Sequence, residues 1–265
     1  MNIVDEYRRS LKSVGGEEIF DVIFYRPLAL LVVRVISRTP VTPNQVTTLS
    51  LLAGVGSAFW LAHGTPSALA WSAVVYAFAN VLDCADGQLA RLQKSGTPLG
   101  RVWDGVADYI SSVAIFLAIW WISPGHLLWL VLFAGISSAV HAMVFDYYQR
   151  LFILAGKDDP VEEEIRRLED EISQAASPAP RMFFLGLYVA YLKQQRAITR
   201  RVGSGGKTGL SIRYWSFLGP TTNRTALIVC MLVARVDLYL AIVAFVGNLW
   251  MVMCVLLQNR PYRKY

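Results

Sequence analysis

The sequence is poor in the residues from which soluble enzymes commonly build their sites. It has only three histidines and three cysteines in 265 residues. Cys84, Cys230 and Cys254 lie in or beside apolar runs, without the spacing of a zinc site or a disulfide framework, so we expect packing residues. The glycines of 203–207 lack the spacing of a phosphate-binding loop. The first 18 residues are polar and mixed in charge, which predicts no cleavable signal peptide.

Charge is also scarce, whereas apolar residues are abundant. Charged residues make up 17% of the chain, hydrophobic residues make up 55%, and the mean hydropathy is +0.42. This composition is too apolar for an ordinary soluble domain and is typical of a polytopic membrane protein. The formal net charge of +6 suits a nucleic acid or an anionic membrane surface. Because the basic residues fall on loops between apolar runs, we expect membrane lipids and no nucleic acid as partners.

The apolar runs predict an all-α membrane protein with six transmembrane helices. A shorter run at 27–38, which contains Arg34 and Arg38, predicts an amphipathic helix lying in the interface before them. The expected spans, each near the roughly 20 residues that cross a bilayer, are 44–62, 67–84, 104–122, 127–147, 216–234 and 237–257. We divide the chain into an N-terminal segment with the interfacial helix (1–40), helices one to four (41–147), a helical connection (148–213), and helices five and six with a basic tail (214–265).

The distribution of lysine and arginine predicts the orientation. The 85–103 loop, the 148–213 connection and the C-terminal tail are basic, whereas the loops at 63–67 and 123–126 contain no Lys or Arg. Cytosolic loops carry the excess of these residues. We therefore expect a multi-pass protein of the cell membrane, with both termini, the helical connection and the 85–103 loop in the cytosol.

The 148–213 connection contains a strong helix signal. Asp159 is a suitable N-cap, Pro160 suits the first helical position, and Glu162 completes a capping box. An apolar stripe follows on one face, and we expect it to pack on the rest of the protein or on a second subunit; it consists of Val161, Ile165, Leu168 and Ile172.

The stretch 83–108 gathers acidic residues at the edges of two apolar runs. Asp83 and Asp86 are three residues apart, and Asp104 and Asp108 are four apart, so each pair shares one face of a helix. Carboxylates are costly in such places and by default mark a functional site. Their oxygens predict a site for Mg²⁺, Mn²⁺ or Ca²⁺. The competing interpretation is a structural network with nearby basic residues, namely Arg91, Lys94 and Arg101.

Residues between the acids favour phosphate chemistry. Gly87, Ala90 and Gly100 are small enough for a ligand to approach closely, and Arg91 is a fork-shaped donor suited to phosphate. The spacing D-x2-DG-x2-AR-x8-G-x3-D-x3-D over residues 83–108 resembles the signature of the CDP-alcohol phosphotransferase family, and every motif residue is present. The layout of spans over residues 25–255 resembles that family too, least so in the 148–213 connection.

The resemblance implies an enzyme that transfers a phosphate-linked group from a CDP-linked donor to an alcohol and releases CMP. It implies two Mg²⁺ or Mn²⁺ ions, and it implies that Asp108 is both a metal ligand and the general base. The metal ligands that it implies are Asp83, Asp86, Asp104 and Asp108. The nucleotide and pyrophosphate would lie at Gly87, Ala90, Arg91, Gly100, Asn44 and Thr47. A homodimer is implied by the resemblance alone.

The text FYRP at 24–27 and TPNQVT at 42–47 resembles a bacterial branch of the family that makes phosphatidylinositol phosphate from CDP-diacylglycerol. A phosphorylated acceptor such as inositol phosphate would need cations near the site. Arg224 is the most telling candidate, because an arginine within an apolar run is costly unless it meets an anion or a partner. The full set of candidates is Arg224, Arg213, Arg200 and Arg196.

Three alternatives stay open at this point. The acceptor could be glycerol phosphate, serine or inositol. A headgroup could instead pass from CDP-choline or CDP-ethanolamine to a lipid alcohol, which would use the same metal site. A divalent-metal transporter would explain the aspartates, but it leaves the Gly, Ala and Arg spacing without a reason and predicts acids in mid-membrane.

Overall fold

The computed structural model describes residues 7, 10–11, 15–153, 160–174, 179–202 and 212–258. Within these residues all regular secondary structure is helical, as expected. The longer helices are α2 (Arg26–Ile36), α3 (Pro43–Leu61), α4 (Pro66–Leu92), α5 (Pro98–Ile122), α6 (Leu128–Ile153), α7 (Pro160–Gln174), α8 (Ala179–Val202), α10 (Pro220–Leu232) and α12 (Asn248–Gln258). Shorter segments are η1 (Asp21–Tyr25), η2 (Gly125–Leu127), α9 (Ile212–Trp215), η3 (Ser216–Leu218), α11 (Val236–Ala241) and η4 (Ile242–Gly247).

Three helices begin at Thr-Pro pairs. Thr42, Thr65 and Thr97 are the N-caps of α3, α4 and α5, and each side-chain oxygen accepts a hydrogen bond from the backbone N–H three residues further on. The proline that follows suits the first helical position, where the missing N–H would have no intrahelical partner. The sequence thus fixes where these three helices start.

The predicted loop over 85–103 was wrong. Helix α4 continues to Leu92 and α5 starts at Pro98, so only residues 93–97 connect them. The physical reason is local: the motif supplies good helix formers after Gly87, and the Thr97 cap begins the next helix early. All the motif residues therefore stand on helices.

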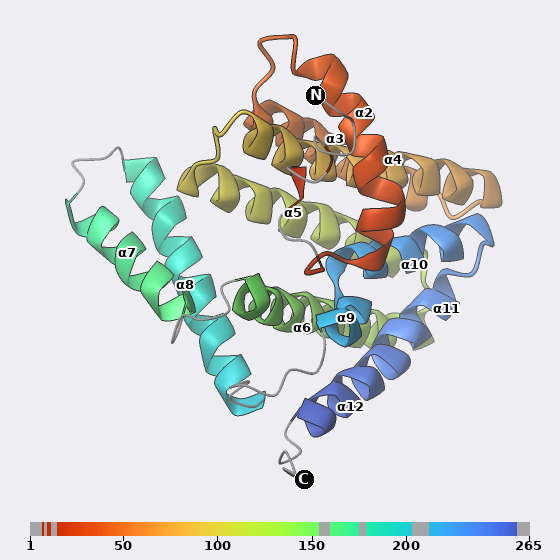
Figure 1. Ribbon diagram of the computed structural model, residues 1–265. Coiled ribbons are helices and arrows are strands. Elements are labelled where there is room, and N and C mark those ends of the chain that lie inside the picture. The colour runs from red at the N-terminus through yellow and green to blue at the C-terminus, as the bar shows by residue number, and fades with distance from the viewer. Residues whose placement is uncertain are drawn as a thin grey trace.

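Helices α3, α4, α5 and α10 pack around the acidic stretch. Figure 1 shows α3, α4 and α5 lying together in the upper half of the view, and α10 contacts α4. Their shared apolar core lies deeper along the helices than the acids and includes Leu61, Ala73, Ile119, Leu227 and Met231, each at most 1% exposed. Burial of such side chains stabilises a fold by about 1.5–3 kcal/mol each. The core thus holds the four helices that present the polar residues.

Helices α3 and α5 approach each other closely at Gly54. A Cβ at this position would lie 2.6 Å from the hydroxyl oxygen of Ser111 and 2.9 Å from its Cβ. A larger residue would therefore have to push the two helices apart. Gly54 allows the close contact.

Among the described residues, four helical segments are long and apolar enough to cross a membrane: Pro66–Leu92, Pro98–Ile122, Gly125–Ile153 and Val236–Gln258. The expected count of six is not confirmed. Helix α3 corresponds to the first expected span, but its first turns are polar. The expected span 216–234 is divided between η3 and α10, and the 13 residues of α10 extend only about 20 Å against a hydrocarbon core of about 30 Å.

Helix α7 begins at Pro160, as the sequence predicts, and forms an antiparallel pair with α8. The capping residue Asp159 lies outside the described residues. Val161, Ile165 and Leu168 are buried in a cluster with α8 side chains and with Val102 of α5. The apolar stripe therefore packs on the rest of the same chain, which was one of the two expectations.

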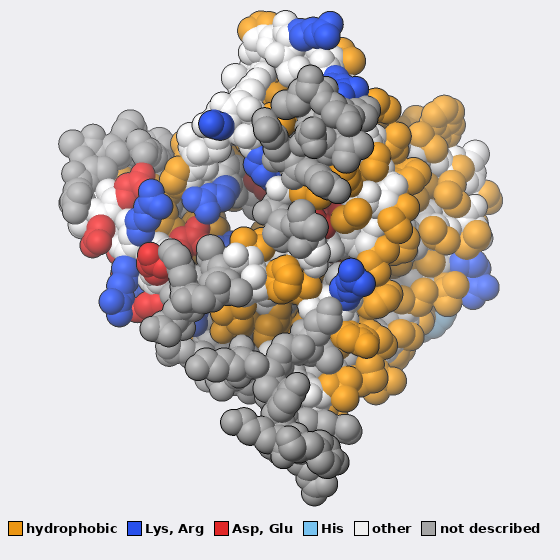
Figure 2. Space-filling view, in the orientation of Figure 1, with side chains coloured by type: hydrophobic (Ala, Val, Ile, Leu, Met, Phe, Trp, Pro, Cys, Tyr) orange, Lys and Arg blue, Asp and Glu red, His pale blue; other side chains and the backbone are white. Residues whose placement is uncertain are grey.

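The surface separates apolar from charged side chains. Hydrophobic side chains cover the right-hand side of Figure 2, over α4, α10 and α11, and acidic and basic side chains gather on the left over α7 and α8. Exposed apolar residues of α4 and α10 include Trp71, Phe78 and Leu232. This division is typical of a membrane protein with one polar end.

Candidate active site

Three of the four predicted carboxylates come together. Asp83 and Asp86 lie on the C-terminal part of α4, and Asp104 lies near the start of α5. One ligand oxygen from each lies within 4.8 Å of the other two. Asp86 is buried and accepts a hydrogen bond from the Thr47 hydroxyl of α3. The spacing argument thus placed the acids on facing helix ends correctly.

Asp108 has a different neighbour. Its Oδ1 lies 2.5 Å from Nη2 of Arg224, while Nη1 of the same arginine donates to Asp83 at 3.1 Å and to Asn80 Oδ1 at 3.0 Å. The Arg224 side chain is only 12% exposed. Helix α10 therefore inserts a cation between Asp83 and Asp108, although more than 100 residues separate it from them in the sequence.

A cleft of about 400 Å³ opens beside the carboxylates. Its walls come from the start of α3, the end of α4 and the start of α5. Seven predicted site residues line it: Asn44, Thr47, Asp86, Gly87, Ala90, Gly100 and Asp104. A Cβ at Gly100 would meet Asn44 Oδ1 at 3.1 Å, so glycine lets α5 approach the start of α3 here.

A second, smaller cavity of about 210 Å³ lies on the other side of the acids. Asp108 and Arg224 line it together with Tyr76 and Asn80 of α4 and Ser111 of α5. The acidic residues are thus divided between two spaces, since Asp86 and Asp104 face the cleft whereas Asp108 faces the inner cavity. The carboxylates therefore border two separate spaces, of which the inner one is the narrower.

The comparison with known families decides the identity of the fold. Residues 40–218 match the CDP-alcohol phosphatidyltransferase family. The chain belongs to this family. The match includes the cleft, all four carboxylates and the α7–α8 pair.

Two curated relatives are named phosphatidylinositol phosphate synthase. The protein of Corynebacterium glutamicum is 36% identical and that of Mycolicibacterium smegmatis is 34% identical, each over 102 residues and 38% of this chain. The alignments cover 43% and 45% of the two relatives, so this chain spans less than half of their length. A crystal structure of phosphatidylinositol phosphate synthase from Mycobacterium tuberculosis in its apo form is 23% identical, with a TM-score of 0.40, and the match covers 64% of this chain and 93% of that one.

The carboxylates of the site fit a hard divalent cation. Three carboxylate oxygens converge from two helices, and such ions take oxygen ligands. Carboxylates held this close repel one another unless a cation lies among them. The donor set therefore suits Mg²⁺ or Mn²⁺ at Asp83, Asp86 and Asp104.

Arg91 does not line the cleft, unlike its motif neighbours Gly87 and Ala90. Its Nε donates to the backbone carbonyl of Ser10 at 2.5 Å, and its guanidinium packs beside Gly87. The arginine therefore links the chain at Ser10 to the wall of the cleft at Gly87. Its expected contact with phosphate stays a prediction.

The other candidate arginines lie in different settings. Arg196 of α8 forms an ion pair with Glu162 of α7. Arg213 lies on α9 and is exposed. The side chain of Arg200 lies outside the described residues. Of the three acceptor-phosphate candidates whose side chains are described, Arg224 is the one that lies beside the carboxylates of the site.

Sequence reasoning missed Asn80 and Tyr76. Both are buried on α4 and line the inner cavity, and Asn80 accepts a hydrogen bond from Arg224. Asn80 lies one helical turn before Asp83 and within an apolar run, and that position was a usable signal. Tyr76 was hidden among other aromatic residues of the same run.

Proposed function

We propose that this protein transfers a phosphatidyl group from CDP-diacylglycerol to a phosphorylated polar alcohol such as inositol phosphate, with release of CMP. The observation that carries this proposal is Arg224, a buried cation placed beside Asp108 in a cavity separate from the cleft. Family membership supports the CDP-linked donor. The names of the two relatives support the phosphorylated acceptor.

The two spaces suggest where each substrate binds. The cytidine and pyrophosphate of the donor would occupy the cleft, whose glycine and alanine positions leave room near the acids. The acceptor would approach from the side of Asp108, and Arg224 would turn from the carboxylates towards its phosphate. A bidentate arginine suits a phosphate, because its fork-shaped donors match two phosphate oxygens.

The chemistry can be assigned to named side chains. Asp83, Asp86 and Asp104 would hold Mg²⁺ or Mn²⁺, which neutralises phosphate oxygens and polarises phosphorus when bound. Asp108 would take the proton of the acceptor hydroxyl. The hydroxyl oxygen would then form a bond to the phosphorus that carries the diacylglycerol, and the bond from that phosphorus to the oxygen of CMP would break.

The orientation and assembly stay part of the proposal. We infer that the acidic end of the bundle, both termini and the α7–α8 pair face the cytosol at the cell membrane, where a soluble acceptor and a nucleotide can reach the site. A homodimer is expected from the family resemblance. The cleft beside the carboxylates gives the transporter alternative less support, because ion passage gives no reason for the small residues Gly87, Ala90 and Gly100 that line it.

A CMP-release assay on the reconstituted protein tests the proposal. CDP-diacylglycerol should support turnover with inositol phosphate above inositol, glycerol phosphate or serine, and EDTA should abolish it. CDP-choline and CDP-ethanolamine with diacylglycerol should give none. Turnover with CDP-choline or CDP-ethanolamine would contradict the proposed donor. An equal rate with inositol and with inositol phosphate would contradict the proposed acceptor.

A further inference from the structure

Residues 15–26, here called the N-terminal segment, cross the polar end of the bundle and contact three of its helices. Gln149 of α6 donates to the Gly16 carbonyl at 2.7 Å, and Gln88 of α4 donates to the Arg26 carbonyl at 3.1 Å. Glu18 reaches the start of α10. The sequence predicted the first 18 residues to be a polar lead-in, yet Glu18 is only 2% exposed.

Glu18 caps α10 from a distance of about 200 residues in the sequence. Gly219, at the N-cap position of α10, has no side chain with which to accept hydrogen bonds from the first turn. The carboxyl group of Glu18 takes this place: Oε1 accepts from Thr221 N at 3.1 Å, and Oε2 accepts from Thr222 N at 2.7 Å and from the Thr222 hydroxyl at 2.9 Å.

The fit around this carboxyl group is close. A Cβ added to Gly219 would overlap the Glu18 carboxyl group, so a side chain at 219 and the present position of Glu18 exclude each other. The overlap involves the end of a long side chain, which can move away. An alanine at 219 would therefore displace Glu18 from its hydrogen bonds while leaving the backbone of α10 able to form.

Arg224 follows two residues after Thr222, in the same part of α10. Its Nη1 lies within hydrogen-bond distance of Asn80 and Asp83, and its Nη2 lies beside Asp108. α10 is short, and only the three-residue η3 separates its start from α9. A small rotation or shift of this end would therefore move the guanidinium relative to the acids.

We propose that Glu18 is a positioning residue that fixes the start of α10 and thereby the place of Arg224 in the carboxylate site. This deepens the proposed function, because it rests on Arg224 meeting the acceptor phosphate. Glu18 acts through α10 and touches no substrate. Its loss should weaken use of the phosphorylated acceptor more than use of the CDP-linked donor.

Glu18→Gln tests the inference with little change in volume. The amide keeps one accepting oxygen but presents an NH₂ group to donors of Thr222, so it cannot replace all three hydrogen bonds. We expect the KM for inositol phosphate to rise about tenfold, with the KM for CDP-diacylglycerol changed less than about twofold. Glu17→Gln is the matched control, since Glu17 is adjacent and buried but pairs with Arg26; its acceptor KM should stay near that of the wild type.

A double-mutant cycle separates positioning from general damage. Gly219→Ala should raise the acceptor KM in the wild-type background, because its methyl group displaces Glu18. In a Glu18→Ala background there is no carboxyl group to displace, and Gly219→Ala should add little. Additive effects of the two substitutions would overturn the inference, as would equal effects of Glu18→Gln and Glu17→Gln.

Direct Mn²⁺ binding gives a readout that does not depend on turnover. Arg224 pairs with Asp83 and Asp108, so a displaced Arg224 should let Mn²⁺ bind more tightly. We expect Glu18→Gln and Arg224→Gln to lower the Mn²⁺ dissociation constant in the same direction, with Glu17→Gln unchanged. If the wild type used no phosphorylated acceptor, the proposed function would fail, and this binding comparison would still decide the role of Glu18.

Discussion

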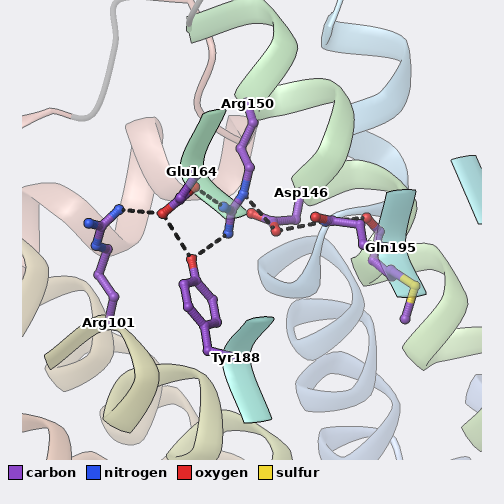
Figure 3. Close-up of polar contacts among 7 residues, drawn as sticks. Arg101, Asp146, Arg150, Glu164, Tyr188 and Gln195 are labelled. Carbon is purple, nitrogen blue, oxygen red and sulfur yellow. Dashed lines mark hydrogen bonds and ion pairs between the residues drawn. The ribbon is translucent and has the colours of Figure 1, made fainter. Parts of the chain in front are cut away.

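Two clusters of charged side chains lie near the start of α5, and their acidic residues differ in the partners that they contact. One cluster links α5, α6, α7 and α8 (Figure 3). In it, Glu164 forms ion pairs with Nη1 of Arg101 at 3.0 Å and with Nη1 of Arg150 at 2.7 Å. Asp146 receives Arg150 at 3.1 Å and Gln195 at 2.9 Å. We call this the α7–α8 network. In the candidate active site, Asp83, Asp86 and Asp104 are close neighbours of one another, and Arg224 pairs with Asp83 and Asp108.

We infer that the ion pairs of the α7–α8 network hold helices together, whereas the carboxylates of the candidate active site bind a ligand. Acids matched with arginines in the α7–α8 network need no further partner, and the i,i+4 pair of Asp146 with Arg150 is among them. The ligand oxygens of Asp83, Asp86 and Asp104 lie within 4.8 Å of one another, so the three carboxylates repel each other. A divalent cation bound among them would relieve this repulsion. Loss of charge should therefore reduce activity in the site and stability in the network.

The largest effect is expected for Asp108→Asn. The amide cannot accept the proton of an attacking hydroxyl, so CMP release should fall by about 10²–10⁴-fold. Binding of the CDP moiety in the presence of Mn²⁺ should persist, because the cleft is lined by other residues. CMP release and nucleotide binding should be measured on the same preparation. Turnover near that of the wild type would contradict the role of Asp108 as a base.

A smaller and more selective effect is expected for Arg224→Ala. Removing its charged hydrogen bonds to a phosphate should raise the KM for the phosphorylated acceptor by about 10–100-fold. The KM for CDP-diacylglycerol should change far less. Arg213→Ala is a suitable control, because Arg213 is exposed on α9. Equal increases of both KM values in the Arg224 variant would remove the acceptor assignment.

Glu164→Gln should give the reverse pattern. Glu164 is 19% exposed, so loss of its pairs with two arginines should lower the free energy of unfolding by about 1–2 kcal/mol. CMP release should stay within about twofold of the wild type. Arg166→Gln provides the comparison, since Arg166 is 75% exposed and its pair with Glu162 should contribute less than about 0.5 kcal/mol. Thermal unfolding in detergent measures both, and a large loss of activity with unchanged stability would break the contrast.

Glu18 offers a third case, a buried carboxyl group bound by neutral donors. Burial first and the Asp21 carboxylate second raise its pKa to about 8, while hydrogen bonds from Thr222 and Thr221 lower it. A folded-state pKa above the unfolded value means that the stabilising contribution is complete below about pH 4.5 and is lost as the pH rises through about 8. The melting temperature of the wild type should therefore fall relative to that of Glu18→Gln between about pH 6 and about pH 9. Parallel curves for the two proteins would contradict this shift.

The sequence predicted the parts of the site that depend on local rules. Helical spacing placed Asp83, Asp86 and Asp104 on facing helix ends. The family signature covered the walls of the cleft. These predictions worked because each one needed only neighbouring residues in a helix.

Long-range contacts escaped the same reasoning. Arg224 could be flagged as costly, but nothing in the sequence says which acids it meets. In the sequence, Glu18 is one of several charged residues in a polar N-terminal stretch. Its partners could not be predicted, because they lie 203 and 204 residues away. Arg91 was expected at phosphate, and its contact with the Ser10 carbonyl depends on where the N-terminal chain returns. Such contacts are set by the tertiary packing of several helices.

The close contact of Gly54 with Ser111 has a mechanical consequence for the cleft. Thr47 and Asp104 stand on opposite walls, and the contact lies two helical turns deeper on the same two helices, about 10 Å away. α3 and α5 also approach each other near the rim, where a Cβ at Gly100 would lie 3.1 Å from Asn44 Oδ1. Two missing side chains, one deep in the bundle and one at the rim, thus keep these two walls of the cleft close together.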